Sequence, residues 1–147
     1  MSYSMVSIAG KSYAPKNISM SDVMDIAKMP STHFERQLSR VLMTITDNKV
    51  DVLKLTCEER YAIFLHYLDI TRDHNDLGIT INPNDYLAEN LDDFTHERKQ
   101  NDNGVSVRHL LGVEAEALEN GCENTSDWII GEMAMTIGCE LLPPLDI

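Results

Sequence analysis

The sequence predicts a mainly α-helical fold with a minor β component, an α+β protein in which residues 1–147 form one compact domain. The length suits a single domain, and a chain of this size buries a core without needing disulfides. Apolar residues recur at helical spacing after capping motifs in several segments. Alternating apolar residues occur only in short stretches near glycines. We therefore expect a helical core with a short β-hairpin in the second half.

The N-terminal segment, residues 1–17, is expected to be extended. Its alternating apolar residues before Gly10 are typical of a short edge strand. A short helix follows, with Ser19 or Ser21 as its N-cap and an end at Met29, because the next residue is a proline.

Residues 18–71 are expected to form the helical, neutral half of the chain. Thr32 and Glu35 form a capping-box pattern, which opens an amphipathic helix. The apolar face of this helix is predicted to hold Phe34, Leu38, Val41, Leu42 and Ile45. Arg36 and Arg40 lie four residues apart on its polar side.

A second capping box, Thr56 with Glu59, opens a helix from Cys57 to about Asp69. Apolar residues surround this helix on nearly all sides, which is typical of a buried helix. Its main apolar face is predicted to be Tyr61, Phe64, Leu65 and Leu68. We expect this helix to be the core element of the fold.

The second half begins with a polar, acidic connection, residues 72–104. Within it, residues 77–81 alternate like a strand, and an Asn-Gly pair near its end is a hairpin signal. Residues 94–100 and 105–109 are accordingly predicted to pair as strands.

Residues 105–142 are the acidic helical half. Residues 110–120 are predicted to form a helix, with Gly121 as the left-handed residue just beyond its end. A last helix is expected from Trp128 to about Cys139, capped by one of the three polar residues before it. Its apolar face is predicted to hold Trp128, Ile129, Met133 (or, in its place, Gly131) and Ile137.

The formal net charge of −12 falls entirely in the second half of the chain. Residues 1–74 hold nine acidic and nine basic side chains, whereas residues 75–147 hold fifteen acidic and three basic ones. Nucleic-acid backbones and anionic membranes attract Lys and Arg, so this distribution argues against both as partners. The sequence shows no membrane-span run and no signal peptide, and its three cysteines form no disulfide pattern. We expect a protein of a reducing compartment.

The motifs argue against an enzyme. The Gly10-Lys11-Ser12 triplet lacks the earlier glycine of a phosphate-binding loop, residues 101–104 lack the ligands of a calcium loop, and the histidines are not spaced as metal ligands. Cys57, at a helix N-terminus, is the cysteine that best suits a reactive thiolate, although a small apolar role is the simpler interpretation. We predict no catalytic, cofactor-binding or metal-binding residues, and a function carried by a surface.

One segment resembles a known family. Residues 55–68, LTCEERYAIFLHYL, resemble a helix of small proteins encoded in the tail operons of tailed bacteriophages, some of them base-plate proteins and some tail-assembly proteins. Further similarities lie at residues 85–87, 110–119 and 127–134, so that about half of the chain is covered. Some base-plate relatives carry paired, metal-binding cysteines after this helix. This sequence has none there, so no metal site is carried over.

The resemblance implies a non-enzymatic structural or assembly component of a phage tail, at the base plate. It would dock to other tail or base-plate proteins in a multi-subunit assembly, without a cofactor, in the virion tail or in the host cytoplasm during assembly. Two alternatives remain open: a tail-assembly chaperone that is absent from the mature particle, and an acidic inhibitor that mimics DNA. Interfaces concentrate affinity on aromatic and arginine side chains. The candidates are Arg36, Arg40, Tyr86, Phe94 and Trp128.

Overall fold

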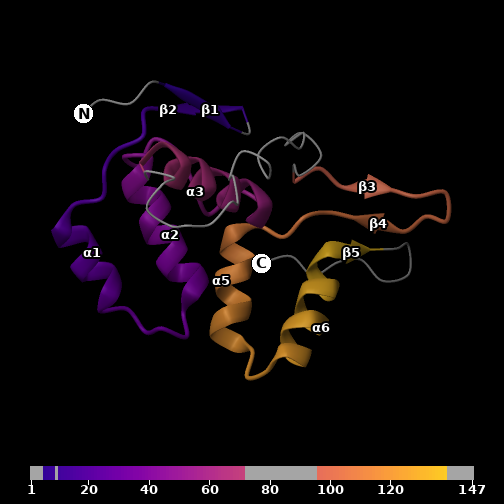
Figure 1. Ribbon diagram of the computed structural model, residues 1–147. Coiled ribbons are helices and arrows are strands. Elements are labelled where there is room, and N and C mark those ends of the chain that lie inside the picture. The colour runs from indigo at the N-terminus through magenta and orange to yellow at the C-terminus, as the bar shows by residue number, and fades with distance from the viewer. Residues whose placement is uncertain (1–4, 9, 72–95, 139–147) are drawn as a thin grey trace, which may run out of the picture.

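The structure is a computed structural model that describes residues 5–8, 10–71 and 96–138 (Figure 1). The described residues include five helices, α1 (Met20–Ala27), α2 (Phe34–Ile45), α3 (Cys57–Thr71), α5 (Gly112–Gly121) and α6 (Thr125–Thr136). Two antiparallel sheets accompany them, one of β1 (Val6–Ile8) and β2 (Lys11–Tyr13), the other of β3 (Lys99–Gln100), β4 (Ser106–Val107) and β5 (Ile137–Gly138). The predicted α+β class is confirmed. None of the described helices combines the length and apolar character that crossing a membrane requires.

The N-terminal segment forms a β-hairpin, where we predicted a single edge strand. Val6 pairs with Tyr13, and Gly10 turns the chain with a φ of +68°. Glycine suits this turn because a Cβ would strain the left-handed conformation. Tyr13 is buried in the main core, and burial raises the pKa of its hydroxyl to about 12.

A capping box opens α1. The hydroxyl of Ser19 accepts a hydrogen bond from the backbone N–H of Asp22, and the Asp22 carboxylate accepts one from the backbone N–H of Ser19, both at 3.1 Å. Ser19 is therefore the N-cap, one of the two serines predicted. The helix ends at Ala27, two residues before the predicted Met29.

The helix α2 is amphipathic as predicted, but its predicted capping box is wrong. The N-cap is His33, and its side chain makes no capping hydrogen bond. Glu35 is buried facing α3 instead of pairing with Thr32, which leaves its neighbour Phe34 52% exposed. Farther along the helix, the predicted apolar face is buried at Leu38, Leu42 and Ile45.

The second capping box is confirmed, but α3 buries a different face from the one predicted. Thr56 Oγ1 accepts from the backbone N–H of Glu59 at 3.3 Å, and the Glu59 carboxylate accepts from the backbone N–H of Thr56 at 2.9 Å. The buried residues are Glu59, Arg60, Ala62 and Ile63, whereas Tyr61, Phe64, Leu65 and Leu68 are partly or largely exposed. Because apolar residues lie nearly all round this helix, the sequence did not show which side faces the core. Hydrogen bonds from Arg60 to α2 place the side that carries Arg60 against α2.

Two apolar clusters hold the described elements together. The larger lies among β2, α2, the loop after α2, and α3, and contains Tyr13, Leu38, Leu42, Ile45, Val50, Val52, Leu55, Ala62 and Ile63. The smaller lies between α5 and α6 around Leu110, Ala115 and Leu118. Backbone hydrogen bonds connect them, because the N–H of Cys57 donates to the Leu110 carbonyl at 2.9 Å and the N–H of Gly112 to the Leu55 carbonyl at 2.8 Å. These bonds hold the start of α3 against the start of α5.

The hairpin predicted in the second half is present. Lys99 of β3 lies opposite Val107 of β4, and Gly104 in the turn has a φ of +75°. The described strands are shorter than the predicted segments 94–100 and 105–109. The predicted strand at 77–81 lies outside the described residues.

The last two helices differ from the prediction at their ends. Gly121 is the last helical residue of α5, so it is not a left-handed residue beyond the helix. The N-cap of α6 is Asn124, whose side chain accepts from the backbone N–H of Asp127 at 2.9 Å. After Thr136 the chain enters β5, a strand that we did not predict, and the expected helix end at Cys139 lies outside the described residues.

Candidate functional site

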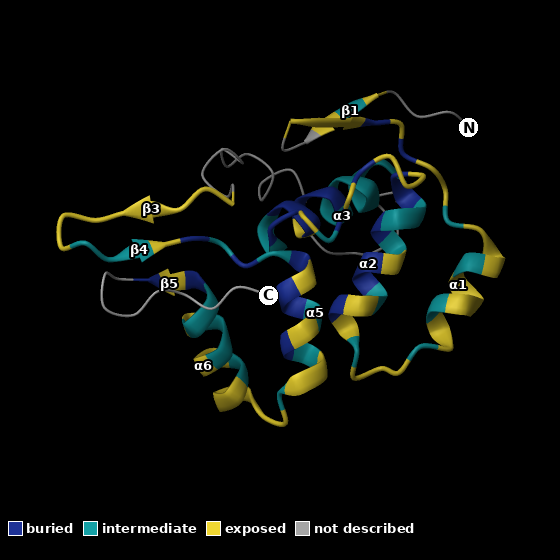
Figure 2. Cartoon of the chain, turned by 180° about the vertical axis from the view of Figure 1, so that it is seen from behind, coloured by how far each residue is buried: buried dark blue, intermediate teal, exposed yellow. Residues whose placement is uncertain are grey.

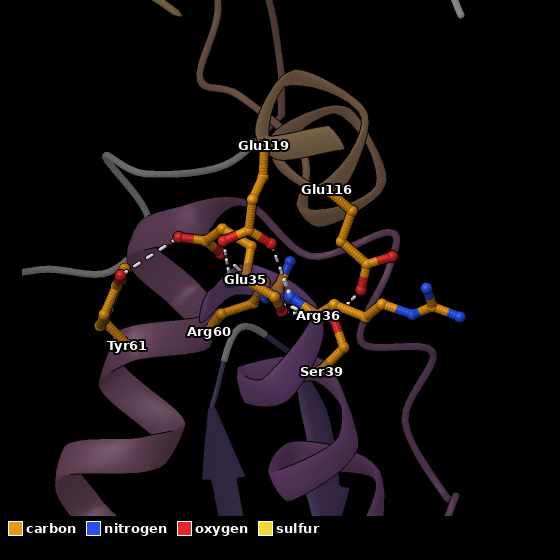
Figure 3. Close-up of polar contacts among 7 residues, drawn as sticks. All are labelled: Glu35, Arg36, Ser39, Arg60, Tyr61, Glu116 and Glu119. Carbon is orange, nitrogen blue, oxygen red and sulfur yellow. Dashed lines mark hydrogen bonds and ion pairs between the residues drawn. The ribbon is translucent and has the colours of Figure 1, made fainter. Parts of the chain in front are cut away.

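Three helices meet in a polar cluster that we call the junction cluster (Figure 3). Its members are Glu35 and Ser39 of α2, Arg60 and Tyr61 of α3, and Glu116 and Glu119 of α5. The Arg60 guanidinium is fully buried and donates to the Glu35 carbonyl at 2.8 Å and to the Ser39 hydroxyl at 2.7 Å. It also lies 3.6 Å from one carboxylate oxygen of Glu35, while the other oxygen accepts from the Tyr61 hydroxyl at 3.2 Å.

The first turn of α2 is capped by a side chain from α5. The Glu119 carboxylate accepts from the backbone N–H of Glu35 at 2.8 Å and from that of Arg36 at 3.2 Å. These N–H groups have no partner within their own helix, and the helix dipole adds a favourable interaction with a negative charge. Glu119, which is distant in the sequence, therefore caps α2 in place of the predicted Thr32.

The pKa of the Glu35 carboxyl is raised above its ordinary value. Burial is the largest cause, and the nearby carboxylates of Glu119 and Glu116 add to it, while Arg60 and Tyr61 act in the opposite direction. The Ser39 hydroxyl donates to Glu116. The cluster thus brings three carboxylates around one buried guanidinium.

A glycine makes room for that guanidinium. A Cβ at Gly112, the first residue of α5, would collide with Nη1, Cδ and Cζ of Arg60. Two Arg60 nitrogens, Nε and Nη1, have no hydrogen-bond partner among the described residues. The arginine is therefore held by its Nη2 contacts and by close packing against the α5 backbone.

A groove runs along α2 beside the junction cluster and shares Ser39 and Glu116 with it. The groove has a volume of about 510 Å³ and is lined by Met29, Pro30, Arg36, Ser39, Arg40, Met43, Leu53 and Glu116. Ser39 and Glu116 bond to one another in its wall, which ties α2 to α5 at this point. Figure 3 shows the Arg36 side chain extending away from the cluster.

The predicted interface residues Arg36 and Arg40 both line this groove. They are exposed and lie one helical turn apart, and within the described residues neither guanidinium makes a hydrogen bond or an ion pair. The only acidic residue of α2, Glu35, is buried. The solvent face of α2 is therefore positively charged above a hollow that is otherwise apolar except for Ser39 and Glu116.

Trp128 is half-buried and packs against the smaller apolar cluster, so it contributes to the contact of α6 with α5. Its indole N–H donates to the Glu132 carboxylate at 3.2 Å. The other two interface candidates, Tyr86 and Phe94, lie outside the described residues.

The outer face of α6 is apolar and exposed, which sequence reasoning missed. A Cβ at Gly131 would collide with the Leu118 side chain, so Gly131 marks the side that contacts α5. Ile129 and Met133, two residues away on either side, point in nearly the opposite direction at 100° per residue. The exposed fractions are 50% for Ile129, 67% for Ile130 and 53% for Met133. Figure 2 shows stretches of α6 in the colour of exposed residues.

The prediction that Ile129 and Met133 belong to the apolar inner face of this helix is therefore wrong, whereas Gly131, the alternative to Met133, does lie on that face. Ile137, assigned to the same face, is also 39% exposed. The inner face of α6 holds Trp128, Gly131 and Met135. Their spacing of three and four residues puts them on one side of a helix, and this spacing is the sequence signal that could have identified that face.

A reactive cysteine or a metal centre finds no support in the described residues. Burial, with the Glu35 charge next in importance, raises the pKa of the Cys57 thiol to about 12, so the thiolate is disfavoured at neutral pH. No group of three or more His, Cys, Asp or Glu residues in the described part of the chain is placed to hold a metal ion.

Comparison with protein families, with curated proteins and with solved structures finds no match to this chain.

Proposed function

We propose that this chain is a non-enzymatic assembly protein that acts by docking to other proteins. The resemblance of residues 55–68, 110–119 and 127–134 to tail-operon proteins narrows the proposal to a phage tail, at the base plate. Its partners would be other tail or base-plate proteins in a multi-subunit particle.

The exposed apolar face of α6 carries the proposal. Ile129, Ile130 and Met133 are each at least half exposed and lie together on the side away from α5. A contiguous exposed apolar patch on a small protein marks an interaction site, because leaving it in water forgoes the free energy of burying it. A docked partner would cover this face.

The polar residues of the described chain support a structural function over catalysis. Glu35 and Arg60 are buried and pair with each other, and Glu119 caps α2. Ser39 and Glu116, which reach the groove, bond to each other. Each of these side chains thus contacts another part of the fold and holds two helices together.

The same contacts weigh against an acidic DNA mimic. Such a mimic needs its carboxylates free at the surface. Glu114 pairs with Arg108 in a nearly buried ion pair at 2.5 Å, while Glu116 and Glu119 make the interhelical bonds described above. Half of the six acidic residues between positions 109 and 138 are thereby engaged within the chain. The assembly chaperone remains the main alternative, because it would use the same apolar face.

Quantitative mass spectrometry of gradient-purified particles from the source tests the proposal. We expect the chain at a constant ratio to tail proteins, and we expect the variant Ile130→Asp with Met133→Asp to be missing from the particles. Absence of the wild-type chain from particles, with tail proteins co-purifying from the lysate, would support the chaperone. Absence from both would refute the proposal.

A further inference from the structure

Two exposed surfaces of this chain complement each other in charge and in apolar character. The outer face of α6 has an apolar centre, and its two charged residues, Asp127 and Glu132, lie toward its two edges at 100° per residue. The groove along α2 offers apolar residues from three segments, together with the cations Arg36 and Arg40 and the carboxylate of Glu116, which leaves a positive balance of one charge. One surface is apolar and negative, and the other is apolar and positive.

The charges on these two surfaces follow a wider division of the chain. Between positions 109 and 138 there are six acidic residues and no lysine or arginine. Lys28 and Lys54, which adjoin the groove residues Met29 and Leu53, form exposed ion pairs with Asp25 and Asp51, so they leave the charge near the groove unchanged on balance. The groove therefore lies in the more basic part of the described chain.

The two surfaces cannot meet within one copy of the chain. In Figures 1 and 2, α5 lies between α2 and α6. The Gly131 side of α6 packs against Leu118 of α5, so the opposite side of α6 is directed away from α5 and from the groove beyond it. A contact between the surfaces requires α6 of one copy and α2 of another.

We infer that a second copy of this chain occupies the groove, with α6 of one copy lying along Arg36 and Arg40 of the next. The inference rests on the proposed docking function, because it assigns a partner to the same face of α6. A pair of copies joined in this way would retain one free groove, on the first copy, and one free α6, on the second. Such head-to-tail contacts close into a ring or extend into a filament, depending on the rotation between copies.

The association is expected to depend on protein concentration. A helix of twelve residues is about 18 Å long. One such helix makes a small contact compared with stable complexes, which bury about 1,200–2,000 Å². The net charge of −12 also makes two copies repel each other at long range.

The test uses the full chain in sedimentation velocity and light scattering, from low to high protein concentration. We expect the wild-type mass to rise above the 16.6 kDa of one chain. The groove variant, Arg36→Glu with Arg40→Glu, and the helix variant, Ile130→Asp with Met133→Asp, should each remain monomeric. A control with the same change of charge, Lys11→Glu with Lys49→Glu, alters exposed lysines that neither line the groove nor belong to α6, and it should associate like the wild type.

Mixing the two monomeric variants is the decisive step. The groove variant keeps an intact α6 and the helix variant keeps an intact groove, so one productive contact remains. We expect a heterodimer that grows no further. If the mixture stays monomeric, or if the wild type stays monomeric at every concentration, the inference is overturned.

These outcomes separate the inference from the proposed function. A monomeric wild type whose helix variant folds normally but is missing from particles would overturn self-association and leave docking to another protein standing. A monomeric wild type whose helix variant loses thermal stability would mean that the chain itself covers this face, which would overturn both.

Discussion

The carboxylate of Glu119 accepts the backbone N–H of Glu35 at 2.8 Å, so α5 caps the N-terminus of α2 from 84 residues away. The same carboxylate accepts the N–H of Arg36 at 3.2 Å. This contact orients α2 relative to α5, and both helices line the groove that carries Arg36 and Arg40.

Replacing Glu119 with alanine removes this cap. We expect a loss of about 1 kcal/mol in the free energy of unfolding, the usual cost of losing a helix N-cap. Urea denaturation measures it. The variant Glu123→Ala, at an exposed acid just before α6, is the matched control and should change stability by less than about 0.5 kcal/mol. Equal effects of the two substitutions would contradict a capping function for Glu119.

Gly112 is expected to be intolerant of a side chain. A Cβ there collides with the buried guanidinium of Arg60, so Gly112→Ala should lower the free energy of unfolding by about 1–3 kcal/mol, as overpacking does. At Gly121, the last residue of the same helix, a Cβ meets nothing within 4 Å. Gly121→Ala should therefore be neutral or stabilise by up to about 1 kcal/mol. Chemical denaturation compares the two, and a tolerated Gly112→Ala would contradict the packing described.

The Arg108–Glu114 pair predicts a loss of stability in acid. Burial by itself would raise the pKa of Glu114, but hydrogen bonds from Arg108 and from the backbone N–H of Leu111 outweigh it, and the net pKa is lowered. The folded chain thus binds this proton less readily than the unfolded chain does. The pair stabilises the fold above the ordinary glutamate pKa, about 4.3, and this contribution is lost as pH falls through the lower folded pKa.

Glu114→Gln tests this linkage. At neutral pH it should lower the free energy of unfolding by about 3 kcal/mol, because it leaves the Arg108 charge nearly buried and without its carboxylate. It should also make stability depend less on pH across the acidic range. Denaturation curves at a series of pH values measure both effects. A variant that keeps the acid dependence of the wild type would show that another carboxylate is responsible.

Substitution on the outer side of α6 should change the free energy of unfolding far less than substitution at its contact with α5. Ile130 is 67% exposed, so Ile130→Glu should leave the free energy of unfolding within about 0.5 kcal/mol of the wild type. Leu118 of α5 is buried against the inner side, so Leu118→Ala should cost about 2–5 kcal/mol. Thermal and urea unfolding measure both variants. A large loss in Ile130→Glu would contradict an open outer face.

Local residue chemistry was sufficient to predict several elements. Ser19 with Asp22 and Thr56 with Glu59 bond over three residues, so a sequence pattern contains both partners of each cap. The Asn-Gly turn likewise predicted the hairpin of β3 and β4, because the turn needs a left-handed residue at Gly104. Arg36 and Arg40 were found as surface cations because their spacing puts them on one side of α2.

The tertiary structure decided what depends on partners distant in the sequence. Thr32 failed as a cap because Glu119 lies close enough to replace it, and no local pattern shows that approach. The sequence by itself determined the helical class, the caps at Ser19 and Thr56 and the acidic second half. An apolar surface all round a helix does not select one side for the core. The tertiary contact of Arg60 with Glu35 therefore decides which side of α3 is buried, and the contact of Gly131 with Leu118 decides it for α6.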